Sequence, residues 1–135
     1  MSTIDLSISE IYDLAYKTML ANGCDSHNAA ALSDIISRAE RDGSHSHGLF
    51  RVPGYVKALR SGKVNGKAKP IVTKKTAVVV HVDGNGCFAP LAQATGLPEL
   101  AEVALESGIA ALSLTNIHHF AALWPETEFL ADRGL

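Results

Sequence analysis

The stretch TAVVVHV at residues 76–82 is followed, after an Ala- and Leu-rich segment, by a second apolar run, IAALSL at residues 109–114. Short apolar runs rich in β-branched residues and bounded by turn residues are typical of buried strands. Residues 91–107, which separate them, favour a helix that Gly108 closes. Strand, helix and strand in this order predict a crossover into a parallel pair. The sequence therefore indicates an α/β fold.

The segments around these strands contain turn residues. Residues 62–75 are rich in Lys and Gly, and we expect an exposed connection there. Asp-Gly-Asn-Gly at residues 83–86 predicts a tight turn. The segment has neither the G-x-G-x-x-G pattern nor the Lys of a P-loop, so we do not assign a phosphate-binding loop there. A last helix is expected to begin at Pro125, whose fixed φ suits the first helical position.

Two amphipathic helices are predicted before the first strand. Ser-Ile-Ser-Glu at residues 7–10 has the form of a capping box, and Asn-Gly at residues 22–23 ends the helix that follows. The second helix begins after Asp25 or Ser26 and ends at Gly43, because glycine tolerates the left-handed conformation found after helix ends.

Composition limits the partners that the chain can have. In 135 residues, 47% are hydrophobic, and 12 Lys and Arg stand against 14 Asp and Glu, so no charge field indicates nucleic acid or a membrane surface. The N-terminus does not resemble a signal peptide, and no run reaches the ~18 apolar residues of a membrane span. Cys24 and Cys87 lie far apart, which fits a reducing compartment. We expect a cytoplasmic protein with a small-molecule partner.

The densest group of chemically active side chains lies at residues 41–55. If a short helix begins near Ser46, His47 and Arg51 stand four apart on one face. An imidazole can exchange a proton at neutral pH, and a guanidinium can bind a carboxylate through two hydrogen bonds. Ser46 could orient the imidazole. In the alternative interpretation, Ser44 or Ser46 caps the next helix and the histidines have no chemical role.

A second candidate site follows the second strand, at residues 116–124. Open α/β sheets usually bind ligands where a strand ends, and helix N-termini attract phosphate. Phe120 and Trp124 could flank a flat ring, so a dinucleotide could bind there. The alternative is that Phe120, Leu123 and Trp124 belong to the core.

Two histidine pairs could contribute to a metal site, His45 with His47 and His118 with His119. Such a site needs three or four ligands, and no carboxylate or cysteine stands at a recognisable spacing from either pair. We therefore assign no metal.

Several of these residues together resemble the signature near the start of the malate/L-lactate dehydrogenase-like oxidoreductases. The matching residues are Asp42-Gly43, Ser46-His47-Gly48, Arg51 and Tyr55, followed in the same order by the turn at residues 83–86 and by Asn116 with His119-Phe120. The resemblance covers essentially the whole chain. It implies N-terminal helices followed by the start of a mixed, non-Rossmann sheet with crossover helices.

Within this family, HFAALWPE at residues 119–126 most resembles the branch that reduces Δ1-pyrroline-2-carboxylate and Δ1-piperideine-2-carboxylate to proline and pipecolate. Malate- and lactate-type members usually have Gly where Ala121 stands. The resemblance implies that Ser46 belongs to a proton relay, His47 donates the proton and Arg51 binds the substrate carboxylate. It also implies an NADP site, with NAD as the alternative cofactor. The residues of that site would be His119, Phe120, Ala121, Ala122, Leu123 and Trp124.

Family members are much longer, so we expect residues 1–135 to be the N-terminal portion of an oxidoreductase, with a helical segment at 1–62 and the start of an α/β part at 76–135. The resemblance also implies a homodimer, or association with the missing C-terminal part. Because the strand at 109–114 is apolar on both faces, it needs cover on both sides. The residues then predicted to be partly exposed are Leu112, Leu114, Phe120 and Leu130.

Two other functions remain open at this stage. One is a 2-hydroxy acid dehydrogenase of the same family, which would act on malate, lactate or ureidoglycolate. The other, from a different class, is an inert truncated fragment that serves as an oligomerisation module through its exposed apolar faces.

Overall fold

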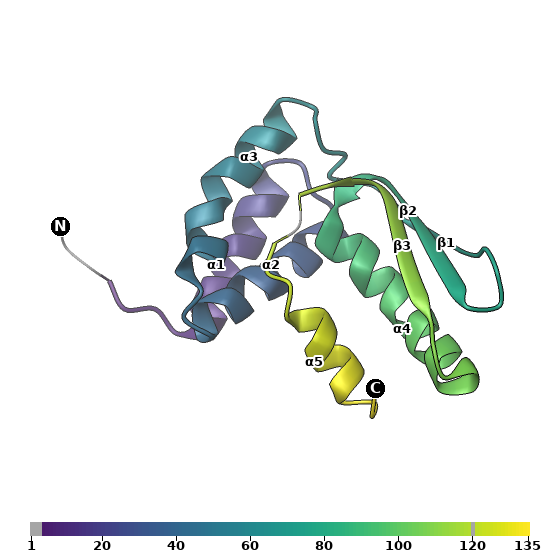
Figure 1. Ribbon diagram of the computed structural model, residues 1–135. Helices are drawn as coiled ribbons and strands as arrows, with labels where there is room; N and C mark the ends of the chain where they lie inside the picture. The colour runs from purple at the N-terminus through teal and green to yellow at the C-terminus, as the bar shows by residue number, and fades with distance from the viewer. Residues whose placement is uncertain (1–3, 120) are drawn as a thin grey trace.

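The computed structural model describes residues 4–119 and 121–135. Its elements in chain order are the helices α1 (Ile8–Ala21) and α2 (Ser26–Arg41), the short 3₁₀ turns η1 (His45–His47) and η2 (Leu49–Arg51), helix α3 (Val52–Arg60), the strands β1 (Ile71–Lys74) and β2 (Val79–Phe88), helix α4 (Ala89–Ser107), strand β3 (Ala111–His118) and helix α5 (Pro125–Ala131) (Figure 1). None of the helices in these ranges is long and apolar enough to cross a membrane.

Helices α1, α2 and α3 form one side of the molecule, and the sheet with α4 forms the other (Figure 1). The predicted capping box is confirmed, since the Ser7 hydroxyl accepts a hydrogen bond from the Glu10 N–H and the Glu10 carboxylate accepts one from the Ser7 N–H. Asp25 caps α2 by accepting the Asn28 N–H at 2.9 Å. Local capping signals therefore placed both helix starts correctly.

The sheet has the order β1-β2-β3, with β1 antiparallel and β3 parallel to β2. Helix α4 connects the two parallel strands and packs against both. It runs through Pro98 and ends at Gly108, which has a φ of 73°. The predicted α/β fold, mixed sheet and parallel crossover are confirmed.

Two predictions about the sheet are wrong. Residues 71–74, expected as a connection, form β1, because β2 offers them an antiparallel partner. Residues 83–86, expected as a tight turn, lie inside β2 as an irregularity between the pairs Asp83–Thr115 and Cys87–Ile117. The Asp83 carboxylate stabilises this irregularity by accepting hydrogen bonds from the Asn85 N–H at 2.9 Å and the Asn116 side chain at 3.0 Å.

Strand β3 forms an edge of the described sheet, and its residues alternate in exposure. Leu112 and Leu114 are half-buried on the side of α4, whereas their neighbours on the other face are exposed. Within the described residues, this other face lacks the cover that the strand at residues 109–114 was predicted to need. The predicted partial exposure is confirmed for these two residues and for Leu130, while Phe120 lies outside the described residues.

Gly96 tests the packing of α4 on the sheet. A Cβ at this buried position would lie 2.7 Å from Val82 Cγ2 and 2.8 Å from Leu112 Cδ1. Gly96→Val should therefore lower the free energy of unfolding by about 1–3 kcal/mol through overpacking, as measured by urea denaturation. The exposed Ala94→Val adds a β-branched residue to the same helix as a control. Equal effects of the two substitutions would contradict the packing described.

Candidate active site

Two short 3₁₀ turns replace the single helix predicted near Ser46. His47 lies in η1 and Arg51 in η2, with Gly48 between the turns at φ −88° and ψ −136°. This non-helical residue separates the two turns, so the two side chains do not share a helix face as expected. The alternative role for Ser44 or Ser46 is also wrong, because no side-chain cap hydrogen bond exists at η1, η2 or α3.

Two serine hydroxyls hold the half-buried imidazole of His47. Its Nδ1 lies 3.0 Å from the Ser46 hydroxyl and 3.3 Å from that of Ser44. Which partner donates depends on the tautomer of the ring. The predicted orienting role of Ser46 agrees with this geometry, whereas Ser44 was considered only as a helix cap. Because Nδ1 is engaged by the hydroxyls, Nε2 is the nitrogen available for a substrate.

Arg51 is held by its own loop and lines a cavity. Its Nε donates to the Ser46 carbonyl at 2.7 Å. Among residues 4–119 and 121–135, Arg51 forms no ion pair. The cavity, of about 180 Å³, is lined by Arg51, Gly54, Tyr55, His118 and His119. The terminal guanidinium nitrogens are thus the groups that an anion in this cavity can reach.

His119 brings a second imidazole to the same cavity. Its ring lies 5.7 Å from that of Tyr55, and its φ is 50°. Partial burial lowers the pKa of His119, and the positive charges of Arg51, His118 and His47 lower it further. The lowered pKa favours the neutral form of His119 next to the permanent charge of Arg51.

Tyr55 forms the inner wall of the cavity. Burial raises the pKa of its phenol to about 12, and its hydroxyl has no hydrogen-bond partner among the described residues. Tyr55 and His118 were not predicted as site residues. Tyr55 entered the sequence analysis only through the family signature, and the spacing of β3 does not reveal that His118 reaches α3.

The segment predicted to bind the cofactor has mixed exposure. Ala121 and Ala122 are buried, whereas Leu123 is 66% exposed and Trp124 is half-buried. The alternative that assigned this segment to the core is therefore wrong for Leu123. Phe120, predicted to line the same site, lies outside the described residues.

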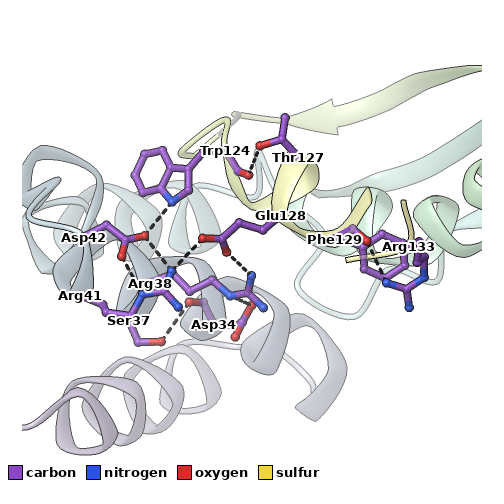
Figure 2. Close-up of polar contacts among 10 residues, drawn as sticks. All are labelled: Asp34, Ser37, Arg38, Arg41, Asp42, Trp124, Thr127, Glu128, Phe129 and Arg133. Atoms are coloured by element: carbon purple, nitrogen blue, oxygen red, sulfur yellow. Dashed lines mark hydrogen bonds and ion pairs between the residues drawn. The ribbon is translucent and has the colours of Figure 1, made fainter. Parts of the chain in front are cut away.

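Trp124 connects this segment to the end of α2. Its indole N–H donates to the Asp42 carboxylate at 2.8 Å (Figure 2). Arg41 also binds Asp42 through two hydrogen bonds, of 2.7 and 2.9 Å, and these are the main cause of the lowered pKa of Asp42. The Glu128 carboxylate of α5 accepts one hydrogen bond from the Arg38 guanidinium and one from the Arg41 guanidinium, each with an N–O distance of 3.1 Å. The candidate cofactor segment is thus anchored beside the loop that carries His47.

The histidine pairs considered for a metal do not gather further ligands. Among the described residues, no group of three or more His, Cys, Asp and Glu side chains could hold a metal ion.

The family model of malate/L-lactate dehydrogenases matches residues 6–135. The chain belongs to the malate/L-lactate dehydrogenase family. It is 43% identical over 132 residues to a Δ1-pyrroline-2-carboxylate reductase of Ancylobacter novellus, covering 98% of this chain and 39% of that protein. It is 41% identical over 133 residues to a Δ1-pyrroline-2-carboxylate/Δ1-piperideine-2-carboxylate reductase of Pseudomonas syringae pv. tomato, with the same two coverages. The predicted family is confirmed.

Solved structures of family members share the fold. The Δ1-piperideine-2-carboxylate reductase of Pseudomonas syringae superposes with a TM-score of 0.93 at 41% identity, over 98% of this chain and 40% of that one. The malate dehydrogenase of Entamoeba histolytica superposes with a TM-score of 0.89 at 27% identity, and the match covers 98% of this chain and 37% of that one. The chain thus spans about 40% of the length of the relatives it matches.

The charge of Arg51 can be tested through the neighbouring imidazole. Arg51→Ala should raise the pKa of His119 towards the ordinary value of about 6.5, because a nearby positive charge that disfavours protonation is removed. Arg51→Lys, which keeps the charge, should leave the pKa low. The measurement is an NMR titration of the histidine ring nitrogens. A pKa of His119 that is the same in all three proteins would show that Arg51 does not face this ring.

Proposed function

We propose that the protein is an NADPH-dependent reductase of cyclic imino acids, which converts Δ1-pyrroline-2-carboxylate to proline and Δ1-piperideine-2-carboxylate to pipecolate. The observation that carries the proposal is the cavity where Arg51 meets His119, next to the loop in which two serine hydroxyls hold His47. His47 itself is not among the residues that line this cavity, and its place in the proposal rests on the loop that it shares with Arg51. Relatives at 43% and 41% identity are named as such reductases. A cytoplasmic homodimer is part of the same proposal.

In this proposal Arg51 binds the substrate carboxylate through its terminal nitrogens, because Nε is already engaged by the Ser46 carbonyl. A neutral His119 beside it can accept or donate a hydrogen bond without adding a second positive charge. The carboxylate therefore fixes the ring of the substrate at the end of the cavity nearest to η2. Positioning of this kind accounts for a large part of the rate of many enzymes.

His47 supplies the proton. Reduction of a C=N bond adds hydride to the ring carbon and a proton to the ring nitrogen, and the bound nicotinamide cofactor would supply the hydride. His47 gives its Nε2 proton to the ring nitrogen of the substrate. The Ser46 hydroxyl, which lies next to His47 Nδ1, exchanges a proton with that nitrogen of the imidazole. The imidazole can then return to its starting state within this relay.

Residues 119–124 are proposed to bind the cofactor, with NADP preferred to NAD. The exposed side chain of Leu123 and the tether from Trp124 to Asp42 support this, because they present an apolar surface on a fixed support beside the catalytic loop. Phe120 is included in the proposal on the resemblance alone. The preference for NADP is tested by repeating each assay with NADH.

The activity is tested by following the loss of NADPH absorbance with the two cyclic imines, pyruvate and oxaloacetate. Faster turnover of the imines is expected. Faster turnover of the keto acids would instead indicate a 2-hydroxy acid dehydrogenase, the activity named for the Entamoeba structure with the same fold. No turnover, together with no NADPH binding by calorimetry, would indicate an inert interaction module.

His47→Ala should lower kcat roughly 100-fold or more, the usual scale for one general acid, with a smaller change in KM. The rate is measured under saturating imine and NADPH. His27→Ala removes an exposed imidazole from α2 and serves as the matched control. Turnover of the His47 variant close to that of the control would assign the proton to another donor.

Arg51→Lys should raise KM more than it lowers kcat, because an ammonium cannot reproduce the planar contact of a guanidinium with a carboxylate. Steady-state kinetics with Δ1-pyrroline-2-carboxylate separate the two constants. Arg60→Lys, at the far end of α3, is the control. If KM stays the same in both variants, Arg51 does not bind the substrate.

A further inference from the structure

Glu40, in the last turn of α2, contacts both ends of the turn that carries His47. Its side chain is only 14% exposed. One carboxylate oxygen accepts the Leu49 N–H at 2.8 Å, and the other lies 2.5 Å from His45 Nδ1. These two partners stand two residues before and two residues after His47. The single carboxylate of Glu40 thus connects His45 to Leu49, one on each side of His47.

Gly48 provides the space for this bridge. A Cβ built at Gly48 would lie 2.5 Å from Glu40 Cδ and closer still to Glu40 Oε1. Contact therefore favours a glycine here, because a methyl group and the Glu40 carboxylate cannot both occupy this position.

The bridge determines the geometry of the candidate catalytic groups. His47 is held by the hydroxyls of Ser44 and Ser46, and the carbonyl of Ser46 holds Arg51. Ser46 and His47 lie between the two residues that Glu40 joins, while Ser44 precedes the first of them and Arg51 follows the second by two residues. Loss of the carboxylate would leave the Leu49 N–H without its partner and release both ends of the turn. His47 and Arg51 would then lose their relative positions together.

We propose that Glu40 is the positioning residue of the proton donor His47, and that Gly48 is required because it accommodates the Glu40 carboxylate. This inference rests on the proposed function, since it assigns Glu40 to the proton transfer of the same site. The Glu40 side chain is mostly buried and both of its carboxylate oxygens are engaged by His45 and Leu49, so it acts through the loop and not on the substrate. Glu40→Gln retains the shape and an acceptor for Leu49, and its amide N–H can donate to His45 Nδ1 when the His45 proton is on Nε2, so it should rescue most of what Glu40→Ala loses.

A double-mutant cycle tests the pairing of Glu40 with Gly48. Glu40→Ala and Gly48→Ala should each lower kcat roughly 10- to 100-fold, the scale of a misplaced catalytic group. In the double variant, the alanine at position 48 should add less than about a twofold loss, because the atoms that it would meet are gone. Glu102→Ala, on the exposed side of α4, is the control for loss of a carboxylate. Fully additive losses would overturn the pairing.

Spectroscopy of the 135-residue chain decides the positioning role without any need for turnover. The ¹⁵N shifts of the His47 ring report its tautomer, and hydrogen exchange of the Leu49 amide reports the bridge. Both should change in Glu40→Ala and in Gly48→Ala, and stay close to the wild type in Glu40→Gln. If both are unchanged in Glu40→Ala, the inference is overturned.

The two proposals can fail separately. A wild-type protein that reduces neither the imines nor the keto acids refutes the proposed function, and the spectra of His47 and Leu49 still decide whether Glu40 positions the loop. An active wild type whose Glu40→Ala variant keeps its kcat refutes the positioning role alone.

Discussion

The contact between Phe88 and Tyr55 joins the helical side of the molecule to the sheet. Phe88 ends β2, directly before α4, and is 1% exposed. Its ring meets Tyr55 of α3 edge to face at 5.1 Å and His118 of β3 at 5.9 Å. Such aromatic pairs add about 0.5–1.5 kcal/mol to the free energy of burial. Because Tyr55 and His118 also line the cavity, the candidate site exists only while this contact holds.

A different kind of interaction holds the candidate cofactor segment. Helix α5 is attached to α2 through Glu128, Arg38 and Arg41, whose side chains are between 34% and 46% exposed (Figure 2). Exposed ion pairs of this kind contribute up to about 1 kcal/mol each. The two parts of the candidate site are thus held by different means, the cavity by a buried aromatic contact and residues 119–124 by exposed charged groups next to them. Only the second kind of attachment is expected to weaken as salt is added.

The sequence predicted the elements whose ends depend on local chemistry. The capping box at Ser7, the left-handed Gly108 and the helix start at Pro125 each need only their immediate neighbours, and all three are found. Strand β1 was missed because its four residues become a strand only through pairing with β2. Residues 83–86 have the composition of a turn, and Asn85 and Gly86 keep left-handed φ values of 50° and 81°, but the pairs with β3 on either side of them continue the strand. Tertiary pairing overrode local preference in both cases.

The candidate site follows the same rule. Its residue types were predictable, since Ser46, His47 and Arg51 are close in sequence and chemically distinctive. Their geometry was not, because it depends on contacts that spacing does not reveal. Glu40 reaches Leu49 from the preceding helix, and Trp124 meets Asp42 across 82 residues. The helical spacing assumed for His47 and Arg51 failed because Glu40 and Gly48 divide the loop into two turns.

Side chains and not the backbone must distinguish the chemistries of this family. The chain superposes on an imine reductase with a TM-score of 0.93 and on a malate dehydrogenase with one of 0.89, so both chemistries use nearly the same framework here. Ala121 stands where malate- and lactate-type sequences usually have Gly, and it is only 7% exposed. Its methyl group is therefore enclosed within the segment proposed to bind the cofactor. If residues 119–124 bind the cofactor as proposed, a glycine at this position would leave room for an additional group of that size, so the difference would act on the shape of the site while the fold stays the same.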